Sequence, residues 1–260
     1  MREPRILTNH DARGVLTIAL NRPEARNALD EATITALLTI CEETARRDDV
    51  RAIVLRGNGP VFCAGADINW MERLSVADEA ANRADAHRFA RMLSALDSLP
   101  QPLISCVHGA AIGGAVGLVA ACDAVIASAE AFFQFSEARI GLAPATIAPL
   151  VARKIGAAQA RYLFLSARRF DARRAETLGL VHEIVSAPDD LDSATGRLLD
   201  DILAGGPSAL ATIKAMLRGV TAHATPDSMA DLLADVRVSD EAREGFQAFR
   251  EKRSPKWMWR

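Results

Sequence analysis

Residues 108–137 read HGAAIGGAVGLVAACDAVIASAEAFFQFSE, and this stretch decides the fold. A short apolar strand pattern, residues 102–107, precedes it. Gly113 and Gly114 then open an apolar run to Cys122 that predicts a buried helix. Adjacent glycines let a ligand approach the backbone, because no Cβ stands in the way. The first helical turn offers unpaired N–H groups and a positive dipole end, so we expect it to hold an oxygen that becomes negative during a reaction.

One acid follows this helix in a hydrophobic setting. A second apolar strand pattern covers residues 123–127, and the phenylalanine-rich residues 132–137 end at Glu137. Burial of a carboxyl group among apolar side chains raises its pKa. The stretch therefore predicts an anion cradle with a single acid beside it.

Composition excludes several classes of protein. The 260 residues suit one large domain, or one domain with a smaller appendage. A net charge of −2 and a pI of about 6.2 give no basic surface for nucleic acid or an anionic membrane. The N-terminus lacks a signal-peptide core, and the apolar run 109–122 is too short to span a bilayer. We expect a soluble, cytoplasmic protein without a metal site. Its four cysteines are far apart in the sequence and are expected to be reduced and buried: Cys41, Cys63, Cys106 and Cys122.

Strand and helix patterns alternate as far as residue 185, and only helix patterns follow residue 189. This order predicts an α/β core with a helical appendage. The main expected elements are a hairpin at 5–9 and 14–20, a helix from an Asp30 N-cap to about residue 47, a strand at 51–56, helices at 76–98 and 145–165, a strand at 181–185, and helix breaks at 205–207 and 225–226. Residues 255–260, PKWMWR, are too apolar to remain in water and pack either on the chain itself or on another subunit.

Five motifs, in order along nearly the whole chain, resemble those of the crotonase superfamily, also called the enoyl-CoA hydratase/isomerase family. They are NRPEARNAL at 21–29, FCAGADI at 62–68, the glycine-rich stretch 109–123, FSE at 135–137 with Gly141, and residues 244–253. The resemblance implies an α/β fold, a spiral of ββα units over residues 1–190 that binds acyl-CoA and carries catalysis. It further implies a helical region, residues 191–260, that forms a homotrimer or a hexamer built as a dimer of trimers. The implied substrates are acyl-CoA thioesters. Coenzyme A is part of the substrate, and no cofactor, nucleic acid or membrane is implied.

The resemblance also assigns roles at the site. The backbone amides of Ala66 and Gly114 would form an oxyanion hole for the thioester oxygen, where losing one donor typically costs about 10²–10³ in rate. Glu137 would exchange a proton with the substrate carbon. Asp67, beside the first donor, is either part of the binding site or a helix cap. Lys252 either reaches a CoA phosphate from a neighbouring subunit or lies on the solvated surface. The expected substrate- or CoA-binding set is Ala25, Arg26, Ala64, Asp67, Ile68 and Lys252.

The chain departs from the two-acid pattern of the family's hydratases. Gly117 occupies the place of the first glutamate, and Ala115 replaces the third glycine. A single acid is what Δ3-Δ2-enoyl-CoA isomerases of the superfamily use. The strings G-G-A-x-G-L and S-E-x-R-I-G-L-A-P are more similar to those of bacterial 3-methylglutaconyl-CoA and carboxygeranoyl-CoA hydratases, which act in leucine and acyclic-terpene degradation. The sequence therefore predicts a lyase that hydrates a 2-enoyl-CoA, with an isomerase or a non-catalytic acyl-CoA binder as alternatives.

Two expectations follow from the missing acid. A distal carboxylate on the substrate would orient the water in its place, and Gly117→Glu would be tolerated by the fold. The sequence does not choose the cation for that carboxylate among Arg26, Arg73, Arg88, Arg91 and Arg139. Of the remaining polar positions, His108 and Asp123 are expected to be structural. Trp70 and Met71 line either the acyl pocket or the core.

Overall fold

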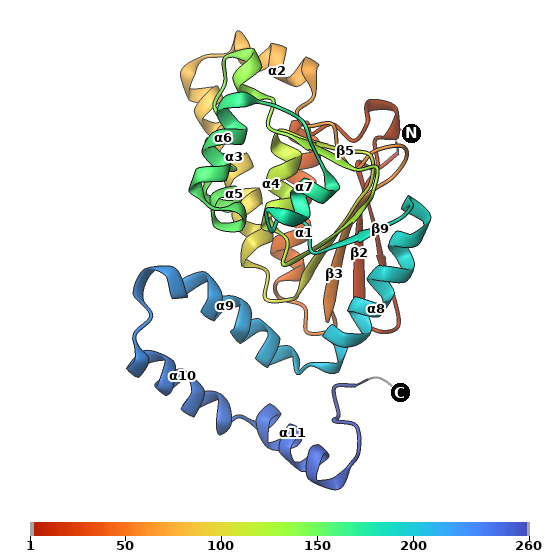
Figure 1. Ribbon diagram of the computed structural model, residues 1–260, viewed down its shortest axis with the longest axis vertical. Helices are drawn as coiled ribbons and strands as arrows, with labels where there is room; N and C mark the ends of the chain where they lie inside the picture. The colour runs from red at the N-terminus through yellow and green to blue at the C-terminus, as the bar shows by residue number, and fades with distance from the viewer. Residues whose placement is uncertain (1–2, 259–260) are drawn as a thin grey trace.

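A six-stranded sheet forms the centre of this computed structural model, which describes residues 3–258 (Figure 1). Its first two strands form the expected antiparallel hairpin, and every later neighbour is parallel. Parallel neighbours need crossover connections, and the intervening helices supply them. In sheet order the strands are β1 (Ile6–His10), β2 (Val15–Leu20), β3 (Ala52–Gly57), β4 (Leu103–Val107), β6 (Ala124–Ser128) and β9 (Glu183–Val185).

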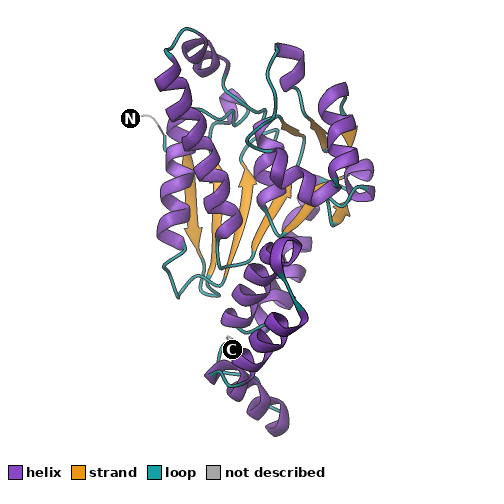
Figure 2. Cartoon of the chain, turned by 90° about the vertical axis from the view of Figure 1, so that its left-hand side faces the viewer, coloured by secondary structure: helices purple, strands orange, loops and turns teal. Residues whose placement is uncertain are grey.

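Both faces of this sheet are covered, because its central strands are apolar on both sides. In β3, Ile53 and Leu55 join the large core under α1, α3 and α4, whereas Ala52 and Val54 join a smaller core under α8. Figure 2 shows the helical layer in front of the sheet. The helices of this layer and its connections are η1 (Pro23–Ala25), α1 (Glu31–Thr44), α2 (Ile68–Ser75), α3 (Glu79–Ser98), α4 (Gly114–Ala121), η2 (Glu137–Ile140), α5 (Ala148–Ile155), α6 (Ala157–Ser166), α7 (Ala172–Thr177) and η3 (Pro188–Asp190).

A second, three-stranded sheet is formed largely by residues 108–137, the stretch that decides the fold. It contains β5 (Ala110–Ile112), β7 (Phe132–Gln134) and β8 (Phe170–Asp171). The strand β5 was not expected, because three residues between glycine turns carry too little pattern. Its parallel pairing with β7 brings the start of α4 beside the segment that ends at Glu137.

The N-terminal caps explain why the predicted helices begin where they do. Asp30 accepts a hydrogen bond from the Thr33 amide at 2.9 Å, which confirms the predicted cap of α1. Asp78 and Asp171 cap α3 and α7 in the same way. Gly156, at φ +78°, separates α5 from α6 within the region expected to be helical.

The C-terminal helices fall into two groups by their packing. Helix α8 (Leu191–Ala204) packs on the sheet through Leu191, Ala194 and Leu199, so it belongs to the core. Only α9 (Pro207–His223), α10 (Pro226–Arg237) and α11 (Asp240–Glu251) extend away from it (Figure 1). We call α9–α11 the helical arm; the boundary expected at residue 191 stays a prediction. Apolar side chains remain exposed along this arm: Ile213, Leu217, Leu233, Val238, Phe246 and Phe249.

One buried arginine ties the arm to the core. The Arg51 guanidinium donates to the carbonyls of Leu203 (3.3 Å), Gly205 (3.0 Å) and Trp257 (2.6 Å). The Trp257 indole donates to Ala204 O at 3.0 Å, so this tryptophan packs on its own chain. Trp259, which shares the expectation made for the chain end, lies outside the described residues.

All four cysteines are buried free thiols, as expected. Within residues 3–258, no helix combines the length and apolar character needed to cross a membrane. Among the side chains that the structure describes, which leave out those of residues 219–223, there is no cluster of three or more His, Cys, Asp or Glu placed to hold a metal ion.

Candidate active site

The first amide predicted to bind an anion lies at the start of α4. The chain leaves β5 through Gly113, at φ +56° and ψ −124°, and Gly114 begins the helix. Gly113 donates to Gln134 O at 2.8 Å, whereas the Gly114 amide has no hydrogen-bond acceptor among residues 3–258. Gly114 is half-buried and so accessible to a ligand. An unpaired N–H at a helix start is a donor for an oxyanion.

The second predicted amide belongs to Ala66, which forms a parallel bridge with Leu29. Leu29 N donates to Gly65 O at 2.7 Å, and Asp67 N donates to Leu29 O at 2.8 Å. Gly65 O and the Ala66 N–H belong to one trans peptide group and point in opposite directions, so the Ala66 N–H points away from Leu29. Ala66 is exposed, and its amide has no acceptor in the described part of the chain.

Backbone pairing brings the two segments that carry these amides side by side. Cys63 and Ala111 form a parallel bridge, and Ile112 N donates to Cys63 O at 3.2 Å. Gly65, at φ +95°, lies so close that a Cβ on it would stand 2.7 Å from Ile112 O. The segment ending at Ala66 therefore runs beside the segment ending at Gly114. Glycine is required at position 65 both by this contact and by its φ angle.

Glu137 lies against the same turn. Its Oε1 is 3.2 Å from the position that a Cβ would take on Gly113, and the Ser136 hydroxyl is 3.7 Å from that position. Glu137 Oε2 is buried without a hydrogen-bond partner among the described residues. Burial raises the pKa of this carboxyl group, with a smaller opposing effect from its own backbone N–H. Phe135, packed edge-on against Phe164 at 4.7 Å between ring centroids, contributes the apolar surroundings.

The place of the missing first glutamate is filled. A Cβ on Gly117 would stand 3.0 Å from the Cβ of Ile147 and nearer still to its Cγ2 methyl group. Leu93 Cδ2 lies 3.5 Å from the same point, and Ile147 is 1% exposed. The expectation that Gly117→Glu would be tolerated is therefore wrong, because Ile147, 30 positions further along the chain, packs directly on this glycine.

The loops expected to bind CoA lie side by side. Ala64 N donates to Arg26 O at 2.9 Å, which joins the first loop to the 62–68 motif. Ala25 and Ala64 are half-buried, Arg26 is exposed, and Ile68 is 72% exposed at the start of α2. Asp67 instead turns inward: its Oδ1 caps α2 by accepting from Trp70 N at 3.2 Å, and its Oδ2 accepts from Arg22 Nη2 at 2.9 Å. Of the two roles considered for Asp67, the structure shows the cap.

Lys252 stands apart from these residues within one chain. It ends α11 in a left-handed conformation, φ +53°, and Figure 1 places α11 at the end of the molecule opposite α2. Among the five candidate arginines, Arg88 is engaged by Glu31 (2.9 Å) and Asp85 (3.3 Å). The other four are exposed and have no ion pair within the described residues: Arg26, Arg73, Arg91 and Arg139.

The remaining expectations concern packing. A ring nitrogen of His108 lies 2.8 Å from Gly59 O, and Asp123 accepts from Leu103 N at 2.7 Å, so both have structural contacts. Trp70 is 9% exposed and belongs to the large core, whereas Met71 is half-buried.

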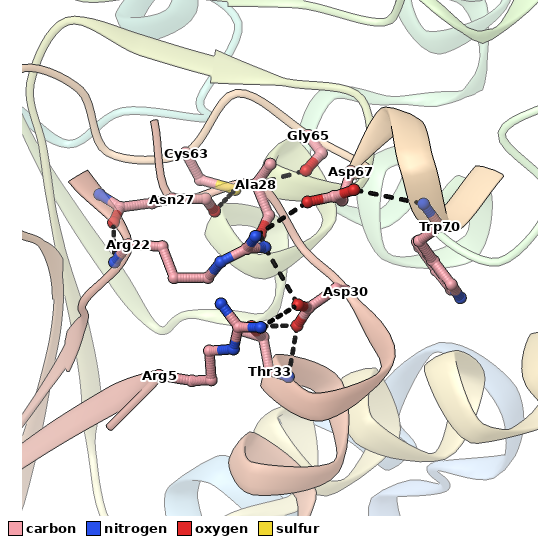
Figure 3. Close-up of polar contacts among 10 residues, drawn as sticks. All are labelled: Arg5, Arg22, Asn27, Ala28, Asp30, Thr33, Cys63, Gly65, Asp67 and Trp70. Carbon is pink, nitrogen blue, oxygen red and sulfur yellow. Dashed lines mark hydrogen bonds and ion pairs between the residues drawn. The ribbon is translucent and has the colours of Figure 1, made fainter. Parts of the chain in front are cut away.

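Two residues of the loop 21–29 that hold the site together, Arg22 and Asn27, were not singled out from the sequence. Asn27, buried at φ +56°, donates to the carbonyls of Asn58, Val61 and Phe62, and its side-chain oxygen accepts from Arg22 N at 2.9 Å. Arg22 contacts two helix caps (Figure 3). Both are polar residues of a loop that ends in Ala28 and Leu29. This apolar end was the available signal that the loop packs against the core.

Comparison with known proteins agrees with this geometry. The family model described as enoyl-CoA hydratase/isomerase matches residues 10–260. Enoyl-CoA hydratase AKT6-1 of Alternaria alternata is 31% identical over 243 residues, covering 92% of this chain and 80% of that protein. The peroxisomal Delta(3,5)-Delta(2,4)-dienoyl-CoA isomerase of Arabidopsis thaliana is 29% identical, covering 97% and 95%. A crystal structure of an enoyl-CoA hydratase from Shewanella pealeana superposes with a TM-score of 0.93 at 38% identity, covering 97% and 96% of the two chains.

The fold and site thus define an acyl-CoA enzyme of the α/β crotonase class. The chain belongs to the enoyl-CoA hydratase/isomerase family.

Proposed function

We propose that this enzyme adds water to the double bond of a 2-enoyl-CoA thioester, with Glu137 as the acid–base residue. One observation carries the proposal: Glu137 Oε1 lies 3.2 Å from the Cβ position of Gly113, the residue directly before the Gly114 donor. An acid there stands beside a thioester whose oxygen is held by that amide. The proposed oxyanion hole consists of the Ala66 and Gly114 amides, neither of which has an acceptor among residues 3–258.

The chemistry divides between these groups. The two amides stabilise the negative charge that develops on the thioester oxygen as water attacks C3, and the start of α4 adds its dipole. The Glu137 carboxylate accepts a proton from the attacking water and then gives a proton to C2 on the same face. The C3–O and C2–H bonds form, the double bond is lost, and the carboxylate is regenerated. No further cofactor takes part in this scheme.

The water needs a second contact, since no glutamate stands at position 117. We assign this contact to the Ser136 hydroxyl, which faces the same point as Glu137 and has no hydrogen-bond partner among the described residues. A carboxylate at the far end of the substrate would supply a further contact. This requirement, together with the motif resemblance, favours 3-methylglutaconyl-CoA as the substrate. The exposed Arg26, Arg73, Arg91 and Arg139 are the candidates to bind that carboxylate.

A panel of acyl-CoAs tests the proposal. We expect hydration of 3-methylglutaconyl-CoA to exceed that of crotonyl-CoA in kcat/KM, and Glu137→Gln to lower kcat by about 10²–10⁴. Ser136→Ala should lower hydration while leaving the fold intact. Full activity of the Glu137→Gln variant would remove the proposed acid, and equal efficiency on the two substrates would remove the substrate assignment.

An isomerase is the second candidate, and the packing of Ile147 against Gly117 favours it. With that site closed, Glu137 is the carboxylate that lies at the Gly113 turn, and one carboxylate suffices to move a proton between C2 and C4. Absorbance distinguishes the two reactions. Hydration removes the conjugated enoyl thioester, whereas isomerisation of a 3-enoyl-CoA creates it.

The exposed apolar side chains of α9–α11 support assembly as a homotrimer or a dimer of trimers, as the family resemblance implies. In such an assembly, Lys252 would reach CoA bound by a neighbouring subunit. Light scattering measures the mass, and a monomer at micromolar concentration would contradict this assembly.

A further inference from the structure

Arg22 contacts three groups on two separate segments of the chain. Its Nη1 donates to Ala28 O at 2.7 Å and lies 3.2 Å from Asp30 Oδ2, and its Nη2 donates to Asp67 Oδ2 at 2.9 Å (Figure 3). Ala28 and Asp30 flank Leu29 on the first segment, and Asp67 follows Ala66 on the second. One guanidinium group therefore spans the bridge between Leu29 and Ala66.

That bridge determines where the Ala66 amide points. The peptide group that carries the Ala66 N–H is bound to Leu29 through Gly65 O, and the peptide group that carries the Ala66 C=O is bound to Leu29 through Asp67 N. Because each peptide group is planar, the direction of the Ala66 N–H follows that of Gly65 O, and it changes when the segment 28–30 shifts against Ala66 and Asp67. Arg22 binds both Asp30 and Asp67, so it sets the distance between the two segments that carry them.

The surroundings make this contact stronger than a surface ion pair. The side chains of Arg22, Asp30 and Asp67 are each 12% exposed, and Arg22 Nε is buried without a partner among residues 3–258. Burial alone would raise the pKa of Asp67, but hydrogen bonds from Arg22 and from the Trp70 amide hold it below its ordinary value. Both acids also cap helices. Without the arginine, two carboxylates would face each other across the bridge with only partial compensation.

We propose that Arg22 is a positioning residue that fixes the direction of the Ala66 N–H and thereby tunes the oxyanion hole. The inference rests on the proposed function of that amide. Misdirecting a donor weakens its bond to an enolate oxygen more than its bond to a neutral thioester, since the charge is greater in the enolate. Loss of Arg22 should therefore lower kcat more than it raises KM.

Two variants at position 22 test this, with a matched control at Arg5. Arg22→Met removes all three contacts. Arg22→Lys keeps the charge, but a single ammonium group cannot replace a planar group that binds three oxygens. Arg5 pairs with the same Asp30 at 3.0 Å and has no contact with Asp67, so Arg5→Met removes one ion pair without touching the Ala66 side. We expect kcat to fall about 10- to 100-fold in Arg22→Met, about tenfold in Arg22→Lys, and not at all in Arg5→Met.

Binding of acetoacetyl-CoA gives a readout that a purely structural role would not move. Its enolate places charge on the thioester oxygen and absorbs in the near ultraviolet, whereas butyryl-CoA cannot form a comparable enolate. We expect the Arg22 variants to lose the enolate absorbance while their affinity for butyryl-CoA stays near that of the wild type. An equal loss of both affinities, or an unchanged kcat and enolate signal, overturns the inference. If Arg22→Met does not fold, Arg22→Lys decides by the same two measurements.

The proposed function fails in a different way. It fails if the wild-type enzyme itself neither converts any 2-enoyl-CoA or 3-enoyl-CoA nor binds the acetoacetyl-CoA enolate. If the wild type is active and the Arg22 variants keep its kcat and enolate absorbance, only the positioning role is rejected.

Discussion

The Cβ of Ile147 lies 3.0 Å from the point where a β-carbon on Gly117 would stand. Gly117 is in the middle of α4, inside the large core, and Ile147 directly precedes α5. The two residues fit only because one of them has no side chain. A larger residue at position 117 would therefore require Ile147 to move.

Gly117→Ala should lower the free energy of unfolding by about 1–3 kcal/mol, because the added methyl group overpacks Ile147. Gly117→Glu should cost more, since it also buries a carboxylate. Urea unfolding measures both. The control is Gly196→Ala in α8, where an added Cβ meets nothing within 4 Å and should stabilise the helix slightly. Equal stabilities of Gly117→Ala and the wild type would contradict the packing.

Adding Ile147→Ala to Gly117→Glu should recover part of the lost stability, because the two sites are in contact and their effects are not additive. The double variant should also gain turnover of crotonyl-CoA relative to Gly117→Glu. Additive losses in a double-mutant cycle would show that the clash lies elsewhere.

The pH dependence of catalysis should report Glu137. Burial raises its pKa above the ordinary glutamate value of 4.5, and the proposed mechanism starts from the ionised form. The value of kcat/KM should therefore be low in acid and rise with pH through a single step centred above 4.5. A profile without such a step across the acid range would count against Glu137 as the base.

The same shift has the opposite effect on stability. A carboxyl group whose pKa is raised on folding favours the folded state below its unfolded pKa, and this contribution is lost as pH rises through the folded pKa. Glu137→Gln should thus raise Tm at pH 7, and the gain should vanish in acid as the wild-type carboxyl becomes protonated. The exposed Glu130 provides the control, since Glu130→Gln should leave Tm unchanged at both pH values.

Arg51→Met should weaken the attachment of the arm. The variant leaves three carbonyl acceptors, one buried and two part-buried, without their donor, so we expect a loss of about 2 kcal/mol or more in urea unfolding. Arg13, whose partner Asp200 is exposed, is the matched control, and Arg13→Met should change stability by less than about 1 kcal/mol. Similar small effects of both substitutions would show that the arm is held by other contacts.

Local patterns predicted most of the fold because local physics produces most of it. The β1–β2 hairpin, the Asp30 cap and the breaks before α9 and α10 each depend on a few adjacent residues. The packing of residues 191–204 depends instead on distant contacts. Their pattern shows an amphipathic helix, but not whether its apolar side meets the sheet or another subunit.

The site was predictable in its parts and not in its contacts. The glycines before α4 and the acid after the phenylalanines are visible in the sequence, whereas their meeting depends on the pairing of β5 with β7. Ile147 contacts Gly117, 30 positions away, and Arg22 binds Asp67, 45 positions away. No sequence periodicity predicts contacts over such separations.

Gly113 has a consequence for how the enzyme can evolve. Its φ of +56° disfavours any side chain, and the first atom of one would meet Glu137. A library of variants sorted for cellular abundance and the same library sorted for turnover should therefore accept the same residue at this codon. At Glu137, by contrast, selection for abundance should favour an uncharged residue such as Gln, whereas selection for turnover should keep Glu.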